Sequence, residues 1–191
     1  MVQMARGGPR TEEKRTEILR RAADVFRRKG FHGAGMREIA QGLGVAPGAL
    51  YYYFESKDDL LYSCQLLTLK RLRESAGRIA ASDAGPAEKV RALVRAHLQH
   101  SLGDLGGSFA HIEFHALPPE RLDEVVQQRD AYEATWRGIL EEFGGGDAKL
   151  KTLTCLGALN WAAVWWRPDG TYGIGEVSRT IADTLLQGLG T

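Results

Sequence analysis

Two short segments near the amino terminus place the strongest constraint on the fold of this chain. Residues 36–43 and 47–54 each have apolar side chains at helical spacing, and only Gly-Val-Ala at residues 44–46 separates them. Pro47 stands at the first helical position of the second segment, where proline is favoured. Two helices of about two turns joined by so short a break predict a helix-turn-helix.

The rest of the chain is also patterned for helices, and no segment has the apolar alternation of a convincing strand. Thr11 can cap the first helix, Gly30 can end it, and Ser56 can open a capping box. We therefore expect an all-α fold of about nine helices. These cover residues 12–29, 36–43, 47–54, 57–80, 86–102, 108–116, 119–143, 148–166 and 175–189.

Positive charge is concentrated at the amino-terminal end. Residues 1–29 hold nine Lys and Arg against four acidic residues, although the formal net charge of the whole chain is only +1. A basic end on a balanced body is typical of a head that binds a polyanion, whereas an ordinary solvated helix face is the alternative. The longest apolar stretch, residues 156–166, is too short to span a membrane, and no secretory signal is visible, so we expect a cytoplasmic protein.

One face of the 47–54 segment is expected to contact double-stranded DNA. Leu50 and Phe54 can pack against the rest of the domain, and the small residues and tyrosines of this helix then face outward. Small residues let the backbone approach DNA, and tyrosine hydroxyls can bond phosphate. Basic residues on either side can neutralise phosphates. An ordinary helical corner with an aromatic core is the alternative. The predicted contacts are Arg37, Pro47, Gly48, Ala49, Tyr51, Tyr52, Tyr53 and Lys57.

The same region resembles the amino-terminal domain of TetR-type transcriptional regulators, over residues 11–62. The resemblance implies a helix-turn-helix domain over residues 11–56. It also implies the DNA contacts named above. Arg6 and Arg10 beside Gly7, Gly8 and Pro9 predict a basic flexible arm at 1–10, which either reaches DNA phosphates or is disordered. Side-chain donors that are frequent in the family are missing at 34–35 and 46–47, so no operator sequence is carried over. The matching residues are 31–33 (FHG), 36–40 (MREIA), 44–45 (GV), 48–54 (GALYYYF) and 56–60 (SKDDL).

Aromatic side chains with polar neighbours recur along the helices expected after residue 62 and indicate a ligand chamber, although the same side chains also line ordinary cores. Asn160 is an amide in an otherwise apolar helix face, so it needs a polar partner if it is buried. The candidate chamber residues are Phe109, His111, Phe114, His115, Arg129, Tyr132, Trp136, Asn160, Trp161 and Trp165.

A second resemblance concerns residues 117–120, 129–133, 159–161 and 165–170. They look like the carboxy-terminal domain of a TetR subgroup that represses fatty-acid, phenylacetate or steroid breakdown. Acyl-coenzyme A thioesters release that subgroup from DNA. The resemblance implies such an effector and no obligatory cofactor, with the phosphates near one of Arg91, Arg95, Arg129 or Arg167. The implied leading contacts are Arg129, Asn160, Trp161, Trp165 and Arg167.

Residues 57–191 are expected to form a ligand-binding and dimerisation domain. One helix-turn-helix makes few contacts, so such proteins read two half-sites about 34 Å apart, or a multiple of that. The last two helices have apolar residues for a four-helix interface with a second copy, or for completing the monomer core. These residues are Leu150, Leu153, Leu156, Val164, Trp165, Ile174, Val177, Ile181, Leu185 and Leu189, with Ala158, Ala162 and Ala163 permitting close approach.

The sequence therefore predicts a TetR-type repressor that leaves a palindromic operator when an effector tilts the helix beginning at Lys57. An activator of the same fold is an alternative. A metal sensor is another, because His97, His100, His111 and His115 lie on two adjacent expected helices. No enzyme is expected, since the chain has no G-x-S-x-G elbow, no P-loop and no G-x-G-x-x-G after a strand.

Overall fold

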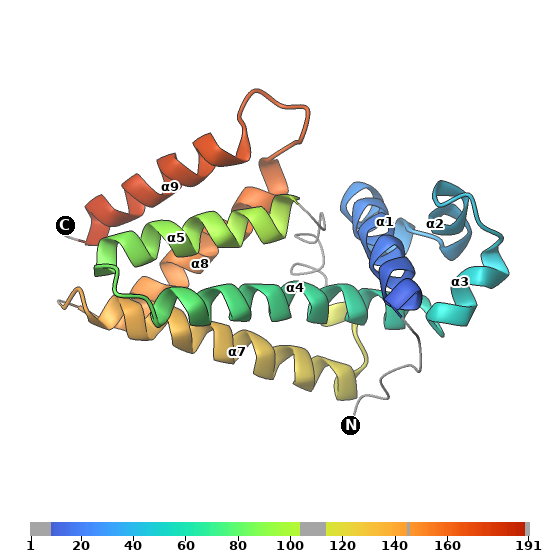
Figure 1. Ribbon diagram of the computed structural model, residues 1–191, viewed down its shortest axis with the longest axis horizontal. Helices are drawn as coiled ribbons and strands as arrows, with labels where there is room; N and C mark the ends of the chain where they lie inside the picture. The colour runs from blue at the N-terminus through green and yellow to red at the C-terminus, as the bar shows by residue number, and fades with distance from the viewer. Residues whose placement is uncertain (1–8, 104–113, 145, 190–191) are drawn as a thin grey trace.

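A computed structural model of the protein describes residues 9–103, 114–144 and 146–189, and every regular element in these ranges is helical. Figure 1 shows an elongated molecule with a head, α1–α3, at one end and a larger body, α4–α9, beside it. The elements are α1 (Pro9–Gly33), α2 (Met36–Gly42), α3 (Pro47–Tyr53), α4 (Lys57–Ala80), α5 (Pro86–Leu98), a π-helical turn η1 (Gln99–Gly103), a 3-10 turn η2 (Phe114–Ala116), α7 (Pro119–Glu141), α8 (Ala148–Trp165) and α9 (Ile174–Leu189).

The expected all-α fold is confirmed, and several expected details change. Thr11 does not cap the first helix, because α1 already begins at Pro9. The expected helix 86–102 is α-helical only to Leu98 and continues as η1, a difference that apolar spacing does not resolve. Of the expected helix 108–116, residues 108–113 lie outside the described residues, and the rest forms the short turn η2. Residues 1–8 of the expected arm also lie outside them.

A cluster of buried apolar side chains holds the head together. Phe26 of α1, Ile39 of α2 and Leu50 of α3 are almost completely buried in it, as is Phe54 at the end of α3. Leu50 is the only buried residue within α3 itself. Because burying one such side chain contributes roughly 1.5–3 kcal/mol, α3 depends mainly on Leu50 and Phe54 for its attachment.

A second cluster of buried side chains fills the body. Trp136 of α7 is fully buried there, among residues of α5 such as Leu93 and residues of α8 such as Leu159. The helix α9 covers α5 on the side away from α7 (Figure 1). No helix among the described residues is long and apolar enough to cross a membrane.

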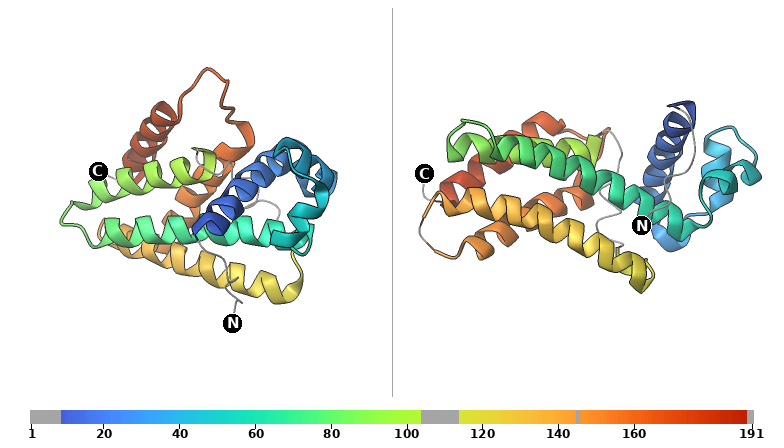
Figure 2. Two further views of the ribbon diagram at one scale, coloured as in Figure 1. Left: turned by 45° about the vertical axis from the view of Figure 1, so that its right-hand side comes forward. Right: turned by 60° about the horizontal axis from the view of Figure 1, so that its bottom comes forward.

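The helix α4 belongs to both clusters. Leu60 and Leu69 pack in the head cluster, whereas Leu72 packs in the body cluster. The helix α7 lies along α4 and is divided similarly, since Val125 joins the head cluster and Tyr132 the body cluster. Figure 2 shows the two helices running side by side from the base of the head. The chain thus passes from head to body inside one continuous helix.

Two glycines in the head have positive φ. Gly30 has φ 73° and ψ 164° and kinks α1, which resumes as far as Gly33, so the expected end of the helix is a kink. Gly44 has φ 66° in the turn between α2 and α3, where its N–H donates to the carbonyl of Gln41 at 3.1 Å. The left-handed backbone at Gly44 fixes how α3 leaves α2.

We predict that Gly44→Ala destabilises the head. A methyl group at this position meets no atom within 4 Å, so the cost comes from the positive φ alone and is about 1–2 kcal/mol. Gly138→Ala in α7 also meets open space but has no positive φ, and we expect it to raise the free energy of unfolding by up to about 1 kcal/mol. Chemical denaturation of both variants measures the change in the free energy of unfolding. A Gly44→Ala protein as stable as wild type would contradict the prediction.

Candidate DNA interface and ligand pocket

The outer face of α3 is accessible because its support comes from one side only. Pro47 stands in the first turn, and Gly48 and Ala49 beside it are exposed. Tyr51 is 55% exposed and Tyr52 is 79% exposed. Two adjacent exposed aromatic side chains beside exposed small residues form a contiguous patch, so this face has the form of a contact surface.

Tyr53 differs from the two tyrosines before it. Its side chain is half-buried against the head cluster, and its ring stands edge-on to that of Tyr52 at 5.0 Å between centroids. Arg15 of α1 donates from Nη1 to the carbonyl oxygen of Tyr53 at 2.6 Å and lies over the Phe54 ring at 4.4 Å. Arg15 therefore clamps the end of α3. Sequence reasoning missed it because the contact spans 38 positions.

The two basic residues predicted on either side of α3 have different surroundings. Arg37 of α2 is exposed. The Lys57 ammonium donates to the carbonyls of Phe31 at 2.9 Å and Ala34 at 3.2 Å, and lies 4.4 Å from the centroid of the Phe31 ring. Lys57 thus ties α4 to the connection between α1 and α2, and its contact with DNA stays a prediction.

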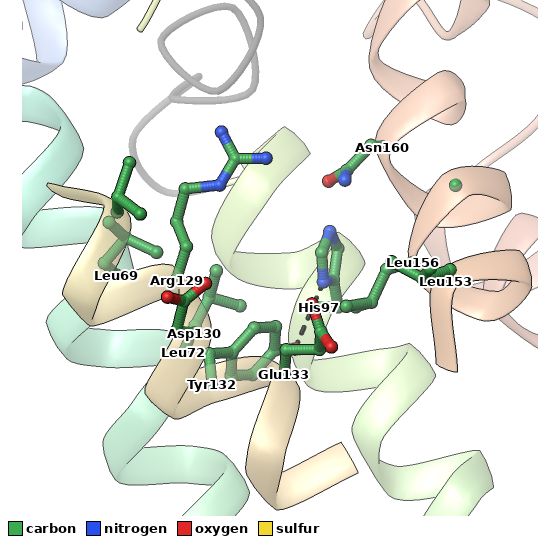
Figure 3. Close-up of a pocket in the computed structure, with 12 residues that line it drawn as sticks. Leu69, Leu72, His97, Arg129, Asp130, Tyr132, Glu133, Leu153, Leu156 and Asn160 are labelled. Carbon is green, nitrogen blue, oxygen red and sulfur yellow. Dashed lines mark hydrogen bonds between the residues drawn. The ribbon is translucent and has the colours of Figure 1, made fainter. Parts of the chain in front are cut away.

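A cavity of about 410 Å³ lies between α4, α5, α7 and α8. Figure 3 shows leucines on opposite sides of it, while the side chains of Arg129 and Asn160 point into the space between them. It unites three of the eleven predicted ligand contacts, Arg129, Tyr132 and Asn160. Its other lining residues are Leu69, Leu72, His97, Val126, Asp130, Glu133, Leu153, Leu156 and Gly157.

The polar groups of this pocket are partly removed from water. Burial lowers the pKa of the Arg129 guanidinium and raises the pKa of the Tyr132 phenol. The Tyr132 hydroxyl shares a hydrogen bond of 3.1 Å with Nδ1 of His97, which is itself buried (Figure 3). This bond holds the His97 ring at the wall of the pocket. Sequence reasoning named His97 only as a metal candidate and not as a ligand contact, because its partner Tyr132 lies 35 positions away in the chain.

The other predicted ligand contacts lie elsewhere. Trp136 is fully buried in the body core and does not line the cavity. Trp161 and Trp165 are exposed on the outer face of α8. Arg167 follows α8 and lines a separate cavity. His115 is exposed on η2, which also contains Phe114, while Phe109 and His111 lie outside the described residues.

Profiles of two known families match this chain. The family described as "Tetracyclin repressor-like, C-terminal domain" matches residues 83–189, and "Bacterial regulatory proteins, tetR family" matches residues 18–64. The chain belongs to the TetR family. It is therefore a DNA-binding transcriptional regulator of the repressor type rather than an enzyme. The predicted TetR resemblance is confirmed over both halves.

Individual relatives agree with this assignment to the TetR family. The transcriptional repressor KstR2 of Rhodococcus jostii is 26% identical over 190 residues, which cover 92% of this chain and 91% of KstR2. The crystal structure of the TetR regulator PfmR from Thermus thermophilus is 31% identical, with a TM-score of 0.80, and the match covers 91% and 99% of the two chains. AibR, crystallised with isovaleryl coenzyme A and operator DNA, shares the fold at 20% identity and a TM-score of 0.74, covering 89% and 97%.

These findings give the metal-sensor alternative no support. Among the described residues, no group of three or more His, Cys, Asp or Glu side chains could hold a metal ion. His97 bonds to Tyr132, whereas Nε2 of His100 bonds to Ser75 Oγ at 2.9 Å. The histidines on α5 and η1 are thus engaged with different helices of this TetR body.

We predict that Tyr52→Ala weakens operator binding without harming the fold. The side chain is 79% exposed, so its loss should change the free energy of unfolding by less than about 0.5 kcal/mol. A lost DNA contact should cost about 1–3 kcal/mol, which is about 5- to 150-fold in affinity. Fluorescence anisotropy with the operator measures this, and Tyr172→Ala, an exposed tyrosine beyond α8, is the control. Equal operator affinity of Tyr52→Ala and wild type would remove Tyr52 from the interface.

Proposed function

We propose that this TetR repressor binds a palindromic operator as a homodimer and is released by an acyl-coenzyme A thioester. We infer the class of the effector from the residues that line the pocket between α4, α5, α7 and α8. Leucines such as Leu72 and Leu156 suit an acyl chain, whereas the Arg129 and Asn160 side chains can donate to a thioester carbonyl. AibR, with isovaleryl coenzyme A and operator DNA in its crystal structure, supports this choice through its shared fold.

A ligand in this pocket touches the helix that carries the head. Leu69 and Leu72 of α4 line the pocket, and only three residues separate the end of α3 from the start of α4 at Lys57. The side chain of Ser56 accepts a hydrogen bond from the N–H of Asp59 and fixes this start of α4. Because α4 is continuous, a tilt at Leu72 moves the base of the head.

The helix α7 offers a second route from the pocket to the head. Arg129 lies on it, and two turns earlier the Arg121 guanidinium forms an ion pair with Asp59 at 3.1 Å. The Tyr62 hydroxyl also donates to Glu124 of α7. The other Asp59 oxygen accepts the N–H of Glu55 at 3.1 Å, directly after α3. Displacement of α7 would therefore reach the end of α3 through Asp59.

Release then requires different affinities of the effector for two arrangements of the heads. A coupling free energy of about 1–3 kcal/mol changes operator affinity by about 5- to 150-fold. The two α3 helices of a dimer must match half-sites about 34 Å apart, or a multiple of that spacing. Because the head extends beyond the start of α4, a small change in the direction of α4 produces a larger displacement of α3. This displacement is enough to change the distance between the two α3 helices so that they no longer fit the half-sites.

We predict that one class of thioester lowers operator affinity by about 5- to 150-fold. The measurement is fluorescence anisotropy of labelled operator, with a panel of branched, medium-chain, aromatic and steroid-derived coenzyme A thioesters. The free acids serve as controls. A panel in which no thioester changes the affinity for DNA would overturn the effector class. Transcription in vitro separates repressor from activator, since a repressor lowers transcript in the absence of the thioester.

The pocket itself is tested with Asn160→Leu, which keeps the size of the side chain and removes its amide. Losing one hydrogen bond of about 0.5–1.5 kcal/mol should weaken the thioester response about 2- to 13-fold and leave operator binding intact. Gln187→Leu removes an exposed amide from α9 and is the matched control. An Asn160→Leu protein with the response of wild type would remove Asn160 from the thioester site.

Exposed apolar side chains on the outer face of α8 are the evidence for the proposed dimer interface. Exposed side chains stand at helical spacing along it, with Leu150, Trp161 and Trp165 at 63%, 64% and 45% exposure. Trp161 and Trp165, which sequence resemblance placed at the ligand, lie on this surface. In α9 the apolar side chains expected at the interface instead pack against the body cluster, and on α8 Ala162 and Ala163 are also buried. We therefore assign the interface mainly to α8 and expect α9 to flank it.

We predict that Trp161→Asp yields a monomer with a mass near 21.0 kDa in light scattering. A carboxylate at the centre of an apolar interface is costly to bury, while the exposed position spares the monomer fold. Operator affinity should fall in parallel, because one head contacts one half-site. Tyr172→Asp places the same charge on an exposed tyrosine beyond α8. A dimeric Trp161→Asp protein would contradict this interface.

A further inference from the structure

We propose that a second cavity, between α1 and the end of α8, binds the phosphate groups of the coenzyme A effector. This inference rests on the proposed function. The cavity has a volume of about 640 Å³. Arg27 and Arg28 of α1 line one side, and Arg167, Pro168 and Asp169 after α8 line the other. Figures 1 and 2 show the end of α8 facing α1 across this space, so its walls belong to both head and body.

The α1 side of the cavity has an excess of positive charge. A single carboxylate, that of Asp24, pairs with Arg27 at 2.8 Å and with Arg28 and Arg21 at 3.2 Å each. Each guanidinium has five N–H donors, and Asp24 occupies only a few of them. One negative charge shared among three arginines leaves this surface able to attract a multivalent anion.

The α8 side adds a third arginine to the cavity lining. Nη1 of Arg167 donates to the carbonyls of Val164 and Trp166 at 3.0 Å each, which holds the side chain against the end of α8. Arg167 forms no ion pair with any described residue. Within the described part of the chain, Asp169 is the only acidic residue lining the cavity. Planar guanidinium groups from two sides suit the oxygens of a diphosphate.

The two cavities lie along one face of α8. Leu156 and Asn160 line the acyl pocket, and Val164 and Arg167 line the arginine cavity. Leu156, Asn160 and Val164 are spaced four residues apart, which keeps them on one side of the helix, and Arg167 follows directly after its end. Leu156 and Val164 are about 12 Å apart along the axis at 1.5 Å per residue. The pantetheine arm has the backbone length of about four extended residues, or about 14 Å, and can join the two cavities.

The positions of these cavities distinguish between the four arginines that the sequence offered as partners of the phosphates. Arg91 and Arg95 line a different cavity with Arg179, between α5 and α9, whose volume of about 40 Å³ holds no more than a few water molecules. Arg129 lies within the acyl pocket. Of the four, Arg167 is the one that faces α1, where phosphates bound between head and body would fix their relative position and so favour one arrangement of the heads.

The test compares coenzyme A with pantetheine, which lacks the phosphates, by calorimetric titration of the full-length protein. We expect wild type to bind coenzyme A at least about tenfold more tightly, since each charged hydrogen bond contributes about tenfold or more. Arg28→Ala combined with Arg167→Ala should remove most of this preference. The control variant, Arg95→Ala combined with Arg179→Ala, removes the same charge from the small cavity and should retain the preference for coenzyme A. Thermal unfolding verifies that both double variants fold.

Two results would overturn the phosphate site. One is a wild-type protein that binds pantetheine as tightly as coenzyme A, and the other is a double variant at Arg28 and Arg167 that retains the full preference. Failure of the proposed function gives a different pattern. In that case no thioester changes operator affinity, while the preference for coenzyme A and its dependence on Arg28 and Arg167 remain measurable.

Discussion

The packing of α4 into two hydrophobic clusters is the constraint on which the rest of the structure depends. Its first turns are buried against the head through Leu60 and Leu69, and its later turns against the body through Leu72. A packed helix cannot bend freely without exposing side chains on one side or the other. The orientation of α3 and the shape of the ligand pocket are therefore coupled, because each is bounded by the same rigid element.

The face of α3 that we propose to contact DNA is held in place by few contacts, which makes its position sensitive to small movements of its neighbours. Within α3 only Leu50 is buried, and beyond it Phe54 and the clamp from Arg15 complete the attachment. The remaining surface of α3 is free for contact with the operator. Small displacements of α4 or of Asp59 thus act directly on a helix that few contacts hold in place.

Sequence patterns predict most of the fold because helical spacing, prolines and glycines act locally. The bounds of α2, α3 and α4 follow from residues inside or next to each helix. The candidate ligand pocket is predicted less completely. Arg129, Tyr132 and Asn160 meet in one pocket, but aromatic residues such as Trp136 and Trp161 have the same pattern in the sequence and differ only in burial. Apolar side chains at helical spacing indicate that they share one face of a helix, but not whether core residues, a ligand or a second subunit covers that face.

The sequence by itself determined most of the helices, the turn at Gly44, the exposure of Tyr51 and Tyr52 and membership of the TetR family, since these depend on neighbouring residues and on spacing. Only the tertiary structure decided which side chains come together from distant helices. Lys57 turns toward the carbonyls of Phe31 and Ala34, and the arginines of α1 face Arg167 across about 140 positions of chain. The physical reason is that a charge in a sequence has no partner until packing brings one within a few ångströms.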